Sequence, residues 1–416
     1  MRYGFKRRTL RRSELEMPMR YALALLLCLA TPLQAETISA EIGRTGLGAT
    51  EARLAALTDP GDAERFALGG VRFLSAVEAA LQLRYAAGLT DRTGMLPFLR
   101  LPLADNPAPQ PFQPAMISDL FRGVDATLSQ ARAPLTEIAP NSDFALKVNF
   151  ADLWFDINAN KTRDTGEDAM AVLGPMLLGW QWDARDPATA APVVKFDAAD
   201  AAWLSAYTHL LQGVSAIVLA YDPTEPIDRI LQSHAKMQSL GGVSPSFITG
   251  AGGAGLDELD VIAIVIAALQ QQPKADQMAK ARLHFLDMIA DNRRFWAAVA
   301  LETDDANEWL PNDKQHSALG LTLPPDTGKV WLSVLNDAEA LLNGDKLAPY
   351  WRQEGAAGVN IAKVFTDPRP ADLAGWLQGW AAAPYLESGA VVSAQNWSAF
   401  EQLVGGEAML LSFYLN

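Results

Sequence analysis

Oxygen-bearing side chains recur at alternate positions of one short segment, residues 156–167. The segment reads DINANKTRDTGE, and its first, third, fifth, seventh, ninth and twelfth positions are Asp156, Asn158, Asn160, Thr162, Asp164 and Glu167. Alternate residues of a tight loop can direct oxygens toward one centre, and calcium takes six to eight oxygen ligands at about 2.3–2.6 Å. The spacing therefore predicts a calcium site, in which Thr162 contributes its backbone carbonyl.

Over these residues alone, the segment resembles the twelve-residue loop of EF-hand calcium-binding proteins. Lys161 stands where that loop usually has a glycine with positive φ. A left-handed conformation costs a lysine about 1 kcal/mol. Arg163 replaces the apolar residue through which two such loops pair. The resemblance thus implies a single structural site, with a dissociation constant of about 10⁻⁴–10⁻³ M. The alternative is an Asn- and Asp-rich turn that binds no metal.

A second acidic segment, residues 302–316, offers further potential metal ligands. They are Glu302, Asp304, Asp305, Glu308, Asp313 and His316. The segment could line the cleft of a secreted metal-assisted hydrolase, or it could be a solvated acidic loop. The chain has neither an H-E-x-x-H nor a G-x-S-x-G motif. His209 lies about 150° from the centre of the apolar face of its predicted helix. With no catalytic motif recognised, the sequence leaves open whether the protein is an enzyme.

The tryptophans suggest a third function, carbohydrate binding. Trp180 with Trp182, and Trp376 with Trp380, could stack on sugars if they were exposed and coplanar. Aromatic side chains at such spacing also build cores. We therefore keep three functional hypotheses: a binding or structural protein with one calcium site, a metal-assisted hydrolase, and a carbohydrate-binding module.

Residues 19–35 have the layout of a secretory signal peptide, with a basic start at Arg20, an apolar run, and Ala35 at the cleavage point. In one interpretation, translation of the protein starts at Met17 or Met19. In the alternative, the arginines of residues 1–16 belong to a twin-arginine export signal in residues 1–35. The sequence predicts a periplasmic or secreted protein. The sole cysteine, Cys28, is lost with the signal, so the mature chain forms no disulfide. No later segment is apolar for long enough to predict a membrane span.

The charge balance bears on partners. The chain has 34 Lys and Arg residues against 48 Asp and Glu residues, a formal net charge of −14. A nucleic-acid-binding protein needs a basic face, so we expect no nucleic-acid partner. A small-molecule or protein ligand remains open. Segments 203–211 and 381–389 resemble those of uncharacterised secreted bacterial proteins. This resemblance does not point to any particular activity.

Hydrophobic periodicity indicates a mainly α, multi-helix globular fold over residues 36–416, with a small β element around residues 144–196. Residues 36–96 could form an N-terminal subdomain, and the proline-rich segment 97–114 predicts a loop. Residues 257–270 are apolar nearly all round, which predicts a central buried helix. The other helices are expected at 62–87, 115–132, 198–221, 274–302, 326–343, 370–382 and 396–413.

Overall fold

The computed structural model describes residues 36–89, 101–179, 182–183, 185–186, 189–241, 258–405 and 408–415. The chain divides into two compact units, Met1–Thr37 and Ile38–Asn416. The predicted signal peptide and residues 97–100 of the proline-rich segment lie outside the described residues. So does Trp180.

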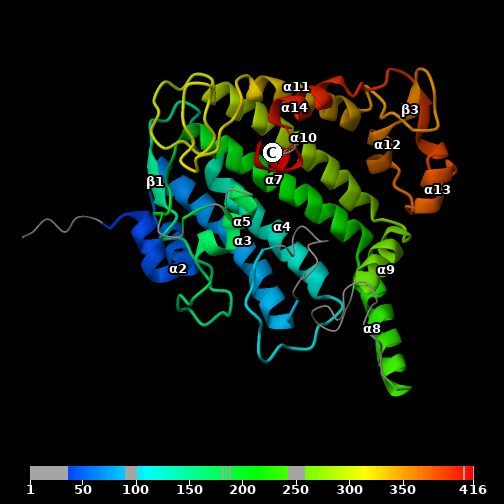
Figure 1. The fold of residues 1–416 in the computed structure, drawn as a ribbon, viewed down its shortest axis with the longest axis horizontal. Helices are drawn as coiled ribbons and strands as arrows, with labels where there is room; N and C mark the ends of the chain where they lie inside the picture. Colours follow the sequence, from blue (N-terminus) through cyan, green and yellow to red (C-terminus); the bar gives the residue numbers. More distant parts are fainter. Residues whose placement is uncertain are drawn as a thin grey trace, which may run out of the picture. The chain divides into compact units, whose positions relative to one another are not determined.

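Helices make up most of the second unit, which confirms the mainly α prediction (Figure 1). They are α2 (Ile38–Ala55), α3 (Asp62–Ala87), α4 (Met116–Leu135), α5 (Ala169–Leu178), α7 (Ala198–Tyr221), α8 (Thr224–Ser239), α9 (Glu258–Leu269), α10 (Ala275–Val299), α11 (Thr327–Asn343), α12 (Ile361–Thr366), α13 (Leu373–Gln378), α14 (Gln395–Val404) and α15 (Ala408–Leu415).

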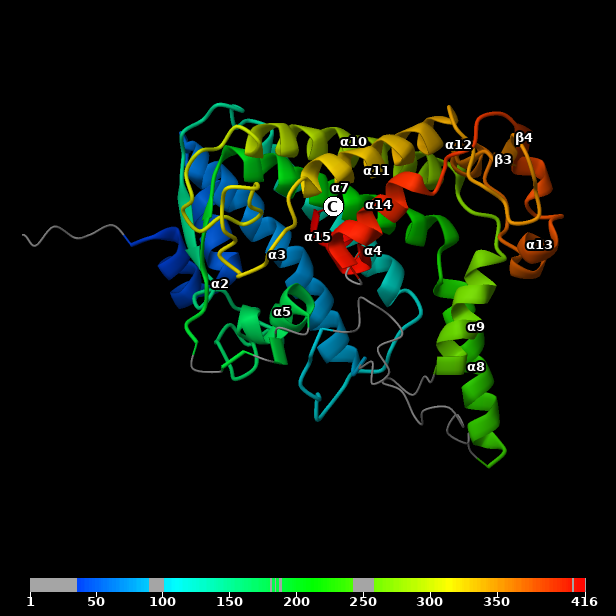
Figure 2. The same ribbon diagram turned by 45° about the horizontal axis from the view of Figure 1, so that its top comes forward.

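Helices α7 and α10 form the largest interface of this unit and run side by side in both ribbon views (Figures 1 and 2). Asp197 caps the start of α7: its side chain accepts from Ala199, and its own N–H is bound by Asp200. Such a capping box satisfies N–H groups that the first helical turn leaves free. At Gly213 a Cβ atom would lie 2.5 Å from the Phe285 ring, so glycine allows the two helices to approach closely.

Helix α4 packs against both α3 and α7, and the main core continues from these helices to the C-terminal segment. Phe155, Phe295 and Phe400 are among its largest fully buried side chains. Trp309 lies at the centre of an aromatic group, with ring centroids 5.2–6.1 Å from those of Trp203, Phe150, Phe196 and Tyr414. Residues from distant parts of the sequence are therefore packed into one core.

The small β element is confirmed. Strands β1 (Leu146–Asn149) and β2 (Val193–Phe196) pair antiparallel, with Leu146 opposite Phe196. A second antiparallel pair, β3 (Ala357–Val359) and β4 (Leu386–Ser388), was not predicted. The first pair matters for function because the predicted calcium loop follows β1 and Asp197 follows β2.

Helix α9 exists, but the prediction that it is central and buried is wrong. Leu259, Ile262, Val265 and Ile266 are all substantially exposed, from 36% to 45%, and α9 packs mainly against α8. A helix that is apolar all round offers no periodic signal of which face is covered. The predicted helix 396–413 is instead two helices, α14 and α15, and α2, α5 and α8 were not predicted.

Described residues 101–114 of the proline-rich segment form no helix or strand, as expected. Helices α3 and α7 are long and apolar enough to cross a membrane by length and composition alone. Core helices of soluble proteins pass the same test, and 61% of the tested α7 window is buried. The expectation of no membrane span stays a prediction.

Candidate functional site

The loop 156–167 draws together the oxygen-bearing side chains that the sequence singled out. The Asp164 carboxylate accepts from the amides of both Asn158 and Asn160, at 2.8 and 2.7 Å. The Asp156 carboxylate accepts from the backbone N–H groups of Asn160 and Lys161, each at 2.9 Å. Four of the six predicted ligands therefore form one hydrogen-bonded group within the segment.

Glu167 closes the loop. It is 4% exposed, and its two carboxylate oxygens accept from the backbone N–H groups of Ile157 and Asp164 at 2.9 and 2.8 Å. The sixth predicted ligand, Thr162, donates its N–H and hydroxyl to the Asn160 side chain at 2.7 and 2.6 Å. Lys161 has a φ of 65°. The chain thus makes the left-handed turn that EF-hand loops make at this position, although the residue is not glycine.

Helix α3 contacts the first residue of the loop. The Glu78 carboxylate accepts from the Asp156 N–H at 2.8 Å, and the Gln82 amide donates to the Asp156 carbonyl at 2.8 Å. Burial, with a smaller contribution from the charges of Asp156 and Glu167, raises the pKa of Glu78 to about 7. A cation in the loop would relieve the repulsion among these three carboxylates.

The loop carboxylates are held by N–H donors and are spread more widely than those of one other group. Across the described parts of the chain, a single set of three acidic or histidine side chains has ligand atoms all within 4.8 Å of one another, and it consists of Asp197, Glu302 and Glu308. Opposite ligands of one calcium ion lie about 4.6–5.2 Å apart. The acids of the loop form no such group, and the loop residues are instead drawn together by the hydrogen bonds described above.

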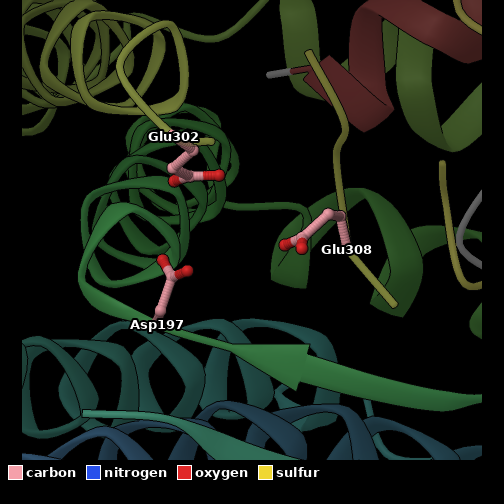
Figure 3. A group of neighbouring side chains, drawn as sticks. All are labelled: Asp197, Glu302 and Glu308. Atoms are coloured by element: carbon pink, nitrogen blue, oxygen red, sulfur yellow. The ribbon is translucent and has the colours of Figure 1, made fainter. Parts of the chain in front are cut away.

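The three carboxylates of Asp197, Glu302 and Glu308, the carboxylate triad, face a common space (Figure 3). Asp197 lies between β2 and α7, Glu302 follows the end of α10, and Glu308 belongs to the loop beyond it. The two glutamates belong to the acidic segment that the sequence singled out, whereas Asp197 was not grouped with them. Its connection to residues more than 100 positions later could not be read from local spacing.

Burial and the neighbouring carboxylates raise the pKa of the two glutamates of the carboxylate triad. Burial raises the pKa of Glu302 to about 7, against a hydrogen bond of 3.1 Å from Gln315, and it also raises the pKa of Glu308. The Lys195 ammonium lies 3.6 Å from the Asp197 carboxylate and is hydrogen-bonded to Asp304. These carboxylates could share protons or could hold a divalent cation, for which oxygen ligands are suited.

The rest of the predicted acidic loop points elsewhere. The His316 side chain is 87% exposed and lies 2.6 Å from the Asp305 carboxylate. Asp313 accepts from the backbone N–H of Asp326 at 3.2 Å, and the Asp304 side chain is 51% exposed. Of the six residues considered in this segment, only Glu302 and Glu308 belong to the carboxylate triad.

The tryptophan pairs have different surroundings. Trp376 stacks on Tyr385, with ring centroids 5.9 Å apart and planes 12° apart, whereas the Trp380 indole donates to Asp372 at 3.0 Å and is 57% exposed. Trp182 packs against α5, where a Cβ atom on Gly174 would lie 2.2 Å from its ring. The carbohydrate-binding hypothesis stays a prediction, without a stacked Trp376–Trp380 pair in the described ring contacts.

Comparison with known proteins adds no relative: no family model, no curated protein and no solved structure matches this chain.

Proposed function

We propose that this chain is an exported, helical binding or structural protein whose loop 156–167 holds one calcium ion. The observation that carries the proposal is the convergence of side chains from alternate loop positions, with Asn158 and Asn160 both bonded to the Asp164 carboxylate. The positive φ of Lys161 supports it, because the chain makes the turn that the coordination pattern requires.

In this proposal the ion has a structural role. Asp156 and Glu167 bring negative charge next to Glu78 of α3, and Gln82 of the same helix binds the Asp156 carbonyl. Calcium would neutralise the loop carboxylates and so strengthen the attachment of the segment between β1 and α5 to α3. The loop would supply stability to a protein that recognises its ligand elsewhere.

Thermal unfolding in calcium and in chelator tests this proposal. At about a hundredfold excess over the dissociation constant, calcium should stabilise the wild-type protein by about 2–3 kcal/mol. Asp156→Ala should abolish this gain, because it removes the first ligand and the acceptor of two loop N–H groups. Asp105→Ala, at an exposed acid outside the loop, is the matched control and should keep the gain. Identical melting in calcium and in chelator for both the wild type and Asp156→Ala would contradict the proposal.

The carboxylate triad favours a second candidate, a metal-assisted hydrolase. Three carboxylates from two distant segments meet there, and a divalent cation bound between them could activate water. Against this candidate, Lys195 already supplies positive charge beside Asp197, and His316 lies away from the triad with its side chain exposed.

Manganese binding, measured by calorimetry in an Asp156→Ala background, separates the two candidates. Binding that is lost in Glu308→Gln but kept in Asp305→Asn would support a metal at the triad, because the Asp305 side chain is 40% exposed and pairs with His316. Hydrolysis of nitrophenyl esters and nitrophenyl phosphates in the presence of manganese would then test catalysis. Absence of manganese binding in that background rejects the hydrolase and leaves the calcium proposal intact.

A further inference from the structure

Helices α4, α7 and α10 line a cavity that shares no residue with the calcium loop or the carboxylate triad. Its volume is about 380 Å³, within the range of about 300–1,000 Å³ typical of small-molecule sites. We call it the α4–α7–α10 pocket; its polar lining includes Arg132, Thr136, Ser205, His209, Asp287 and Arg294.

Arg132 brings a guanidinium into the pocket without a carboxylate partner among the described residues. One of its nitrogens donates to the Thr208 hydroxyl at 3.0 Å and to the Gln212 carbonyl oxygen, and both acceptors are neutral. Burial lowers the pKa of Arg132, although the charges of Asp291 and Asp287 oppose the shift. An anionic group of a ligand would stabilise a partly buried cation of this kind through charge-assisted hydrogen bonds.

Asp287 supplies the opposite charge, also without a hydrogen bond from any described donor. The nearest basic group is the His209 ring, whose Nδ1 lies 4.0 Å from the carboxylate. Burial raises the pKa of Asp287, and the neighbouring Asp291 raises it further. Asp291 itself is already engaged, because it accepts from Ser205 and from Arg294.

The charges of the pocket balance. Asp291 and Arg294 neutralise each other, and within the described part of the chain Arg132 and Asp287 leave one positive and one negative group unpaired. His209 adds no charge at neutral pH, because burial lowers its pKa to about 3. A net-neutral pocket with two unpaired groups of opposite sign matches a ligand that carries both charges.

We propose that the α4–α7–α10 pocket binds a small zwitterion of the α-amino-acid class, with its carboxylate at Arg132 and its ammonium at Asp287. The guanidinium suits a carboxylate because its fork of N–H donors matches two oxygens. The methyl group of Ala290, which also lines the pocket, lies beside the space for the carbon chain. This assigns the protein a ligand that neither the calcium loop nor the carboxylate triad explains.

The test is calorimetry on the full chain with each of the common L-α-amino acids. Any amino acid that binds is compared with its analogue lacking the amino group and with its analogue lacking the carboxyl group. Asp287→Asn and Arg132→Lys should each weaken binding about tenfold or more, because a charged hydrogen bond is lost or a bidentate one cannot form. The matched controls are Asp276→Asn, exposed on α10, and Arg122→Lys, whose side chain is 54% exposed on α4.

Tight binding of an amino acid, lost in both pocket variants and kept in both controls, supports the proposal. The deaminated analogue binding as tightly as the amino acid would overturn it in favour of a simple anion site. The proposal would also be overturned if none of the amino acids bound at millimolar concentration. If Arg132→Lys does not fold, Asp287→Asn decides alone, since its side chain is 61% exposed and makes no hydrogen bond within the described chain.

Discussion

The proposed calcium loop, residues 156–167, and the α4–α7–α10 pocket hold their charges in opposite ways. In the loop, backbone N–H groups of the same short segment bind the carboxylates of Asp156 and Glu167. In the pocket, Arg132 and Asp287 come from different helices, and neither has a charged partner among the described residues. The group nearest to the Asp287 carboxylate is the His209 ring, 4.0 Å away and neutral at pH 7. The loop satisfies its charges locally, whereas the pocket leaves two of them for a ligand.

This difference has a consequence for what each region can do. A loop whose acids are satisfied by N–H groups can exchange those donors for an ion with local rearrangement, so ion binding adds stability to an existing structure. In the pocket, Thr208 and Gln212 of α7 hold Arg132, so a ligand carboxylate meets a guanidinium that is already in place. We therefore expect the loop to govern stability and the pocket to govern recognition.

Acid titration should produce the largest effect, because two buried histidines resist protonation in the folded protein but not in the unfolded chain. The Nδ1 atoms of His209 and His284 lie 2.9 Å apart. Burial lowers the pKa of His209 to about 3 and that of His284 to about 4. The charged or titratable groups that face this pair are Arg132 and Asp125 of α4, and Lys280, Asp287, Asp291 and Arg294 of α10.

The sign follows from these depressed values. Unfolded histidine takes up a proton near its usual pKa of 6.5, whereas the folded pair resists protonation until far lower pH. The stability from this pair is therefore complete above about pH 6.5 and is lost as the pH falls toward 3. Between pH 7 and pH 5, the wild type should lose about 2–4 kcal/mol more than His209→Gln/His284→Gln.

Urea unfolding at the two pH values measures that difference, and comparison at pH 7, where both histidines are neutral, is the control. Proton NMR of the two imidazoles gives a direct check, since neither ring should titrate between pH 7 and pH 5. Titration of both rings near 6.5 would show that the histidines are not enclosed as the structure describes, and it would weaken the contrast between a rigid pocket and an adaptable loop.

The same contrast explains how far the sequence could lead. The loop 156–167 could be singled out because its six candidate ligands follow one another within a single segment. His209 was not expected to be buried, since it lies off the apolar face of its helix, yet it is 8% exposed. Helices α4 and α10 both pack against α7, and a helix covered on two sides buries residues that a single periodic face does not mark.

The carboxylate triad and the exposure of α9 were not predicted from the sequence, for related reasons. Asp197 has a complete local explanation as the cap of α7, so nothing in its neighbourhood indicated Glu302 or Glu308. The apolar residues of α9 correctly predicted a helix, but burial depends on what packs against it, and α8 covers only part of its surface. Local patterns fixed the type of element, and tertiary packing decided which side chains meet.

Substitution of Lys161 should produce the smallest effect and sharpen the account of the loop. At its φ of 65°, Lys161→Gly should stabilise the protein by about 0.5–1 kcal/mol, because relief of the left-handed strain exceeds the added entropy of the unfolded chain. Lys161→Ala removes the same charge but keeps the strain, so it should gain little in chelator. Urea unfolding in calcium and in chelator separates the two contributions. Equal gains for both variants would assign the effect to charge rather than to backbone conformation, and the loop would then be adapted to its lysine rather than strained by it.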